Sequence, residues 1–367
     1  MGGKIMNESY FLGSSGKEGF FSCFSQISPK IDGQYTYIIK GGPGTGKSTL
    51  MRRIADELER RDLACERIYC SSDPDSLDGI IIPSLRVSIT DGTAPHTLDP
   101  EYPGAAGEII NLGECWNKQM LYENRKRIIE LTDKNKDCHR RSRRFIESAF
   151  SIFGDGEKIC RESLDEAKLM RYASRLAGRF FKKPSGRIGL EKIRLLDAIT
   201  PKGYYFMSET VNGLCDQIIV FEDDFGVAAS KVIGEIRTYA LANGFSVISS
   251  PSISNGKAIR HVIIKELSLG FFTADKLCEL GIIPTKNVSL RRFYSSSEIS
   301  SHRARLAFSR KAARELIDEA VCALRMAKNI HDDLENCYKE AMDFEKTKKI
   351  SDELTERIWG GEWWPED

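Results

Sequence analysis

Apolar runs and amphipathic segments alternate over the first 115 residues of the chain. Residues 35–39, 64–70 and 86–90 have the length and apolar content of buried strands, whereas residues 47–61 carry apolar side chains at helical spacing. This order predicts an α/β fold with a parallel sheet and flanking helices. Ligands of such sheets bind at the carboxyl ends of the strands.

Two long segments without proline interrupt this alternation. Residues 116–182 and 298–358 are rich in Lys, Arg, Glu, Leu and Ala at helical spacing, so each is predicted to form an α-helical hairpin. Basic runs at 139–144 and 179–183 leave two hypotheses open, a solvated helix face or a contact with phosphate or nucleic acid. Nearby glutamates favour the solvated face.

A repeat relates the two halves of the chain. Residues 36–92 align without a gap with residues 218–274, and the apolar positions coincide in both strand and helix register. Gly44 falls on Gly226 in this alignment. We therefore expect a nucleotide-binding core at 1–115 with a helical arm at 116–185, and a second core at 186–295 with an arm at 296–367.

A phosphate-binding loop follows the first apolar run. It fits the pattern G-x-x-x-x-G-K-[ST], in which glycines let successive backbone N–H groups approach phosphate oxygens. Lys47 is expected to reach the β- and γ-phosphates, and Ser48 to complete the shell of a Mg²⁺ ion. The residues expected to bind the nucleotide are Gly41, Gly42, Pro43, Gly44, Thr45, Gly46, Lys47, Ser48 and Thr49.

An acidic residue ends the strand predicted at 86–90. From this position the Asp91 carboxylate would hold the Mg²⁺ shell together with Ser48. Gly92 follows it, so no adjacent glutamate is there to activate water, and hydrolysis is expected to be slow or to need another group. His96 is a candidate γ-phosphate sensor, although the sequence favours a loop histidine bonded to the backbone.

Two further acids leave the strand predicted at 64–70, on the same rim of the sheet. Asp73 and Asp75 are candidate catalytic groups that would orient water or an acceptor hydroxyl. A proline-containing turn capped by aspartate explains the same residues equally well. The sequence leaves both hypotheses open.

The second half departs from the first where the chemistry lies. Opposite the phosphate loop it reads Glu222-Asp223-Asp224-Phe225-Gly226-Val227-Ala228-Ala229-Ser230, with Ala229 in place of Lys47. Three acids in this loop would repel phosphate. We expect no nucleotide to bind there, and a scaffolding role is favoured over a regulatory one.

Composition bears on the partners and the cellular location of the protein. The net charge of +1 gives no argument for nucleic acid, and ten cysteines without a C-x-x-C pair indicate reduced thiols. The start lacks the apolar region of a signal peptide, and no run reaches the ~18 apolar residues of a membrane span. We expect a cytoplasmic protein without membrane contact, and a protein partner or homo-oligomer through the helical arms stays open.

The phosphate loop, the segment 70–79 and the segment 91–96 together resemble a family of bacterial ATP-binding proteins with tandem P-loop halves. The resemblance covers the whole chain and implies a P-loop NTPase fold with ATP as ligand. The sequence departs from that family at 222–230. Two classes of function follow as hypotheses: an enzyme that hydrolyses ATP or transfers its phosphoryl group to a small acceptor, and a nucleotide-gated binding protein with incidental turnover.

Overall fold

The computed structural model describes residues 8–27, 33–94, 97–181, 186–254 and 256–361. The chain forms two compact units, and each is built from separate stretches of sequence. The first unit comprises Met1–Leu12, Phe24–Arg141 and Ala323–Asp367, and the second comprises Gly13–Cys23 and Ser142–Cys322. The helices α3 (Arg125–Glu162) and α8 (Arg303–Lys339) each contribute residues to both units.

The first unit contains a six-stranded mixed sheet in the order β1-β5-β6-β7-β4-β8. Its strands are β1 (Glu8–Phe11), β4 (Tyr35–Lys40), β5 (Glu66–Tyr69), β6 (Leu77–Ile82), β7 (Val87–Asp91) and β8 (Gly107–Asn111). Strand β4 is parallel to both β7 and β8, whereas β6 is antiparallel to β5 and β7. The prediction of a parallel sheet is therefore wrong for β6. The connections at 70–76 and 83–86 are too short for parallel crossovers, which need a dozen or more residues.

The second unit contains a six-stranded sheet in the order β16-β12-β15-β14-β13-β9. Its strands are β9 (Glu191–Ile193), β12 (Gln217–Glu222), β13 (Val247–Pro251), β14 (Ile259–Ile264), β15 (Leu269–Ala274) and β16 (Lys286–Ser289). Taken from the β8 edge, the first sheet has the same order and the same strand directions. The two units are thus α/β sheets flanked by helices, consistent with a duplicated domain.

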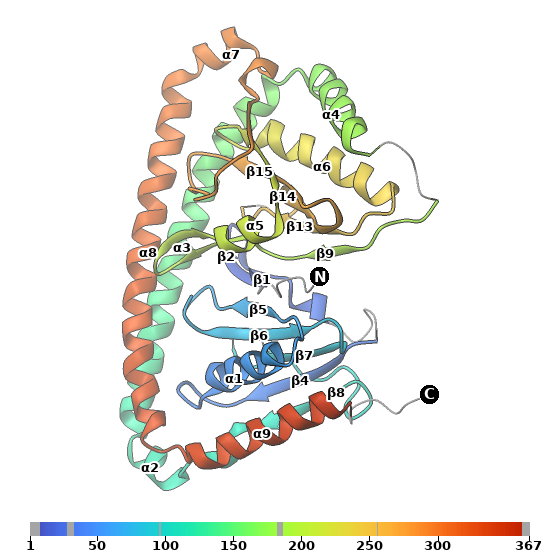
Figure 1. Cartoon of the computed structure of the whole chain (residues 1–367). Coiled ribbons are helices and arrows are strands. Elements are labelled where there is room, and N and C mark those ends of the chain that lie inside the picture. Colours follow the sequence, from blue (N-terminus) through green and yellow to red (C-terminus); the bar gives the residue numbers. More distant parts are fainter. Residues whose placement is uncertain (1–7, 28–32, 95–96, 182–185, 255, 362–367) are drawn as a thin grey trace. The chain divides into compact units, whose positions relative to one another are not determined.

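The core of the first unit lies between its sheet and the helix α1 (Lys47–Arg60). Leu50, Met51 and Ile54 recur at helical spacing and are fully or almost fully buried against strand residues. The helix α9 (Phe344–Gly360) runs beside α1 (Figure 1) and adds Leu354 and Ile358 to this core. Burial of these apolar faces holds both helices on the sheet.

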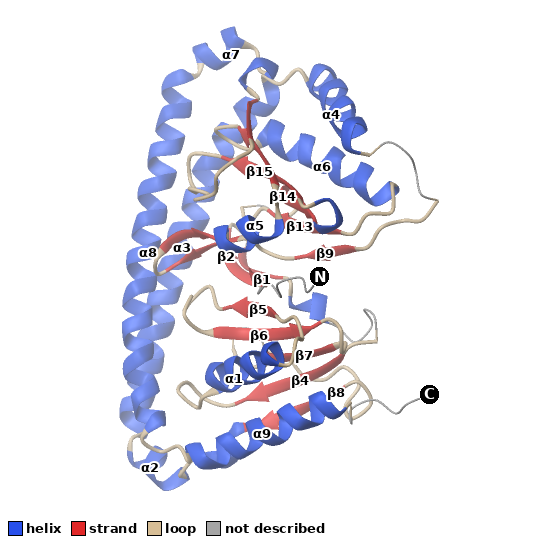
Figure 2. Ribbon diagram, in the orientation of Figure 1, coloured by secondary structure: helices blue, strands red, loops and turns tan. Residues whose placement is uncertain are grey.

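The core of the second unit has the same plan. Its sheet is covered by α6 (Val227–Ala242), and α4 (Glu166–Phe180) packs along α6 (Figure 2). The predicted helical hairpins are therefore wrong in one respect. The shorter helix of each arm packs on the helix that covers the sheet, α4 on α6 and α9 on α1. In each case the apolar face of the shorter helix is buried against that helix.

Shorter elements complete the two units. None of the described helices combines the length and hydrophobicity required to cross a membrane. The remaining helices are α2 (Lys118–Glu123), α5 (Ser208–Leu214) and α7 (Ser296–Ser301), with 3₁₀ turns at Phe24–Ile27, Leu112–Cys115, Lys265–Leu267 and Arg291–Phe293. Two hairpins consist of β2 (Gly13–Gly16) with β3 (Gly19–Ser22), and β10 (Asp197–Thr200) with β11 (Gly203–Phe206).

Candidate functional site

The loop at 41–46 connects β4 to α1 and has the backbone of a tight turn. Gly44 and Gly46 have φ of 67° and 88°, in the left-handed region that residues with a Cβ atom rarely adopt. Thr45 is fully buried, and its hydroxyl donates a hydrogen bond of 2.8 Å to the Gly42 carbonyl. These residues curl the loop, so that its amide groups lie before the N-terminus of α1, where anions are favoured.

Lys47 and Asp91 meet at the carboxyl edge of the first sheet. The Lys47 ammonium lies 3.6 Å from an Asp91 carboxylate oxygen, and both side chains are less than a fifth exposed. Lys47 also donates hydrogen bonds to the carbonyls of Gly41 and Gly42, at 3.0 and 2.8 Å. The pairing follows from the fold, because the parallel neighbours β4 and β7 align Ile39 with Asp91.

The two candidate metal ligands have complementary partners. One Asp91 oxygen accepts hydrogen bonds from the Thr93 amide and hydroxyl, at 2.8 and 2.6 Å, while the other faces Lys47. The Ser48 hydroxyl accepts a hydrogen bond of 2.9 Å from the Leu77 amide. No group of three His, Cys, Asp or Glu side chains that could hold a metal occurs in the described parts of the chain. One hydroxyl and one carboxylate fit Mg²⁺, which usually completes its shell with phosphates and water.

Asp73 has contacts of the kind that the turn hypothesis predicts. Its carboxylate accepts a hydrogen bond of 2.8 Å from the Ser76 hydroxyl, and it lies 3.4 Å from the Lys328 ammonium. Burial opposes the charge of Lys328, but a hydrogen bond to Asp332 and the charge of Asp73 raise its pKa. Asp75 is exposed, and its backbone carbonyl accepts a hydrogen bond from Arg52. A catalytic role of either acid stays a prediction, and His96 lies outside the described residues.

Sequence reasoning missed the C-terminal segment 335–347, which covers the phosphate loop. A Cβ atom added at Gly42 would lie 2.6 Å from the Tyr338 ring, and one added at Gly44 would lie 2.5 Å from the Glu335 carbonyl oxygen. Close packing therefore favours glycine at both positions, and the positive φ of Gly44 adds a conformational reason there. No local pattern near residue 42 signals a contact with residues almost three hundred positions away.

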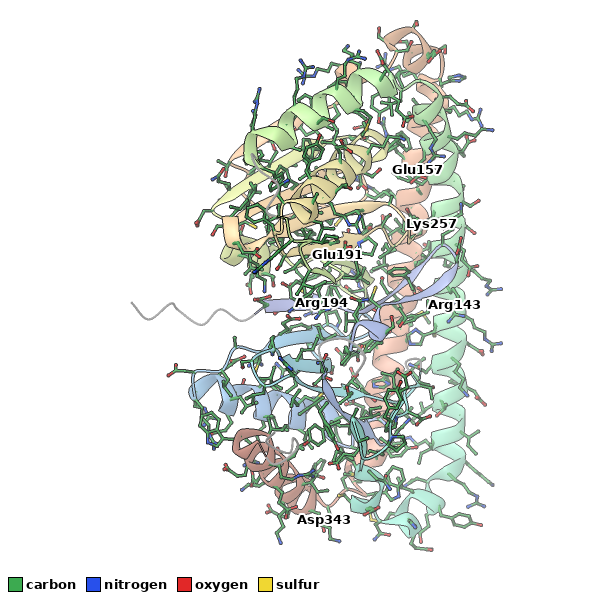
Figure 3. All side chains as sticks on the ribbon, turned by 90° about the vertical axis from the view of Figure 1, so that its right-hand side faces the viewer. Arg143, Glu157, Glu191, Arg194, Lys257 and Asp343 are labelled. Atoms are coloured by element: carbon green, nitrogen blue, oxygen red, sulfur yellow. The ribbon has the colours of Figure 1, made fainter. Side chains whose placement is uncertain are left out.

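The segment turns sharply where α9 begins. Asp343 caps this helix by accepting a hydrogen bond of 3.1 Å from the Lys346 amide (Figure 3). On the preceding helix, hydrogen bonds with His331 and then Lys339 lower the pKa of Glu335 to about 2, against the effect of burial. The segment thus carries fixed charges beside the loop.

The corresponding loop of the second unit holds a carboxylate where a phosphate would bind. Gly226 has φ of 71°, matching Gly44, but α6 begins directly after it. Asp223 is 6% exposed and accepts hydrogen bonds from the amides of Ala228 and Ala229, at 2.7 and 3.0 Å. The Tyr294 hydroxyl donates a further hydrogen bond of 2.9 Å. Burial raises the pKa of Asp223, although these donors favour its charged form.

This geometry refines the expectation that three acids repel phosphate. Glu222 is exposed, and Asp224 pairs with Arg310 on α8. Only Asp223 is aimed at the amides that an anion would need. Occupation of these amides by Asp223 is thus a second reason, beside charge repulsion, to expect no phosphate in this loop.

Comparison of the chain with models of protein families, with curated proteins and with solved structures found no match.

Proposed function

We propose that the first unit binds Mg²⁺–ATP and hydrolyses it, as a P-loop NTPase with one active half. The observation that carries the proposal is the Lys47 ammonium 3.6 Å from Asp91, at the mouth of a glycine loop with two left-handed residues. A cation and a carboxylate at this edge are the two charges that a triphosphate with its metal requires. We also propose that the chain is a member of the tandem P-loop family that its sequence resembles.

Each residue has a role that its position supports. The amides of the loop and Lys47 would cradle the phosphates, and the Lys47 hydrogen bonds to Gly41 and Gly42 hold its ammonium within the loop. Ser48 and Asp91 would hold the metal, which supplies charge compensation for the transferred phosphoryl group. Gly92 provides no base, so turnover is expected to be slow.

Binding and turnover measured side by side test the proposal. Calorimetric titration with ATP and Mg²⁺, together with a phosphate-release assay, should show both for the wild type and neither for Lys47→Ala. Lys118→Ala removes an exposed lysine from α2 of the same unit and is the matched control. Equal ATP affinity and turnover in Lys47→Ala and Lys118→Ala would refute the site.

A nucleotide-gated binding protein is the second candidate. It is favoured by the direct contact of Glu335 and Tyr338 with the loop glycines, since phosphate entry would bear on the end of α8. ATP binding without phosphate release would select this candidate. Phosphate transfer to an added small hydroxyl compound, in place of release to water, would instead select a phosphotransferase.

A further inference from the structure

An exposed aromatic ring lies beside the phosphate loop. Phe344 is 47% exposed, and its ring edge lies 3.8 Å from a Cβ atom added at Gly46, the residue before Lys47. A phenylalanine with half of its surface in water costs free energy, because apolar area stays hydrated. Core packing therefore does not explain this residue.

The helix does not explain it either. Phe344 is the first residue of α9 after the capping Asp343, a place where the helix dipole favours an acidic side chain. The second unit follows that rule. There α4 begins after the capping Asp165 with Glu166, whose carboxylate lies 2.7 Å from the Lys231 ammonium. At equivalent positions, the aromatic ring thus accompanies the intact phosphate loop and the acid accompanies the loop filled by Asp223.

Another aromatic side chain borders the loop, and it presents less surface. Tyr338 packs against Gly42, and its ring centroid is 6.1 Å from that of Trp116. Both are partly buried. Phe344 is the most exposed of the three and lies at the end of the loop that leads into α1.

From this placement we propose that Phe344 is the stacking surface for the base of the bound nucleotide. The inference rests on the proposed function, because the phosphates must be held at 41–48 for the base to reach the ring. A planar heteroaromatic base would cover the exposed face of Phe344, and base–aromatic stacking in proteins is sequence-tolerant and strong. The ligand class is a nucleotide rather than a phosphate ester without a base.

Paired titrations with ATP and with inorganic triphosphate, both with Mg²⁺, test the assignment. Phe344→Ala should weaken ATP binding about tenfold to a hundredfold and leave triphosphate binding unchanged. Phe344→Trp should keep the ATP affinity. Phe308→Ala removes a 65% exposed phenylalanine from α8 and is the matched control for both ligands.

The outcomes are distinguishable. Unchanged ATP affinity in Phe344→Ala would overturn the stacking role while leaving the phosphate site intact. Equal losses for ATP and for triphosphate would also overturn it, because Phe344 would then support the loop and not the base. A wild type that binds neither ligand would refute the proposed function itself, and with it the base site. Circular dichroism of each variant checks that α9 is retained.

Discussion

The two strand-to-helix connections differ most at one aligned position, Gly41 in the first unit and Asp223 in the second. Both connections have a left-handed glycine, Gly44 or Gly226, and both lead into the helix that covers the sheet. The helix N-terminus attracts an anion in each case. In the second unit the chain supplies that anion itself, through Asp223, whereas in the first unit the Lys47 ammonium donates hydrogen bonds to the loop carbonyls of Gly41 and Gly42.

This difference shows how a carboxylate of the chain can take up the amides at a helix N-terminus without a change of fold. Asp223 satisfies the amides of Ala228 and Ala229 and receives the Tyr294 hydroxyl, so the helix end needs no ligand. An unmet helix terminus would otherwise leave backbone donors without acceptors. The sheet order is the same in both units, so the scaffold does not depend on a carboxylate at this position.

The largest expected effect breaks the first half of the comparison at Asp91. Asp91→Asn should reduce Mg²⁺-dependent phosphate release on the order of a hundredfold, since the amide no longer offsets the metal's charge. ATP affinity should fall much less. Asp133→Asn changes an exposed acid on α3 and serves as the control in the same assay. Full turnover in Asp91→Asn would mean that another residue holds the metal, and Asp73 and Asp75 would be tested next.

The next effect breaks the second half of the comparison at Asp223. Asp223→Ala should destabilise the protein by ~2 kcal/mol in urea unfolding, because the Ala229 amide and the Tyr294 hydroxyl lose their acceptor and the Ala228 amide keeps only the Tyr294 oxygen. Asp224→Ala removes the exposed neighbour that pairs with Arg310, and should cost less than ~1 kcal/mol. Equal losses in the two variants would mean that Asp223 is no more than another surface acid.

The sequence predicted those parts of the site that depend on local pattern. The strand and helix on either side of the loop, and the place of Asp91 at the end of a neighbouring parallel strand, follow from the motif and the apolar runs. The strand β6 was not predicted, and its antiparallel direction could not have been read from a run of isoleucines that fits a strand of either direction. The capture of the helix end by Asp223 and the cover formed by Tyr338 and Glu335 depend on contacts far apart in sequence, which periodicity does not encode.

A smaller effect separates two glutamates on the long helices, Glu335 on α8 and Glu157 on α3. Hydrogen bonds with His331 and Lys339 lower the pKa of Glu335 from 4.5 to about 2, so its contribution to stability is present above pH 4.5 and is lost as the pH falls toward 2. Glu335→Gln should cost ~1 kcal/mol at pH 7, after allowance for solvent screening, and should flatten the acid limb of stability against pH.

Glu157 should behave in the opposite way. Burial raises its pKa above 4.5, so its charged form weakens stability as the pH rises through the raised value. Glu157→Gln should therefore leave stability at pH 7 unchanged or slightly increased. Urea unfolding of the wild type and both variants from pH 3 to pH 7 measures the stability that each glutamate contributes. If these two contributions change with pH in the same direction, the assignment of opposite environments is contradicted.

The last prediction is that the second unit binds no nucleotide, even after a lysine is restored. The wild type should bind one nucleotide per chain, because Asp223 already occupies the amides of Ala228 and Ala229. Ala229→Lys should not add a second site. The new ammonium would supply one charge, but the amides would stay bonded to Asp223, and α6 begins directly after Gly226 without a second left-handed glycine. Calorimetric stoichiometry of two in either protein would show that the second unit binds nucleotide and that its carboxylate yields to phosphate.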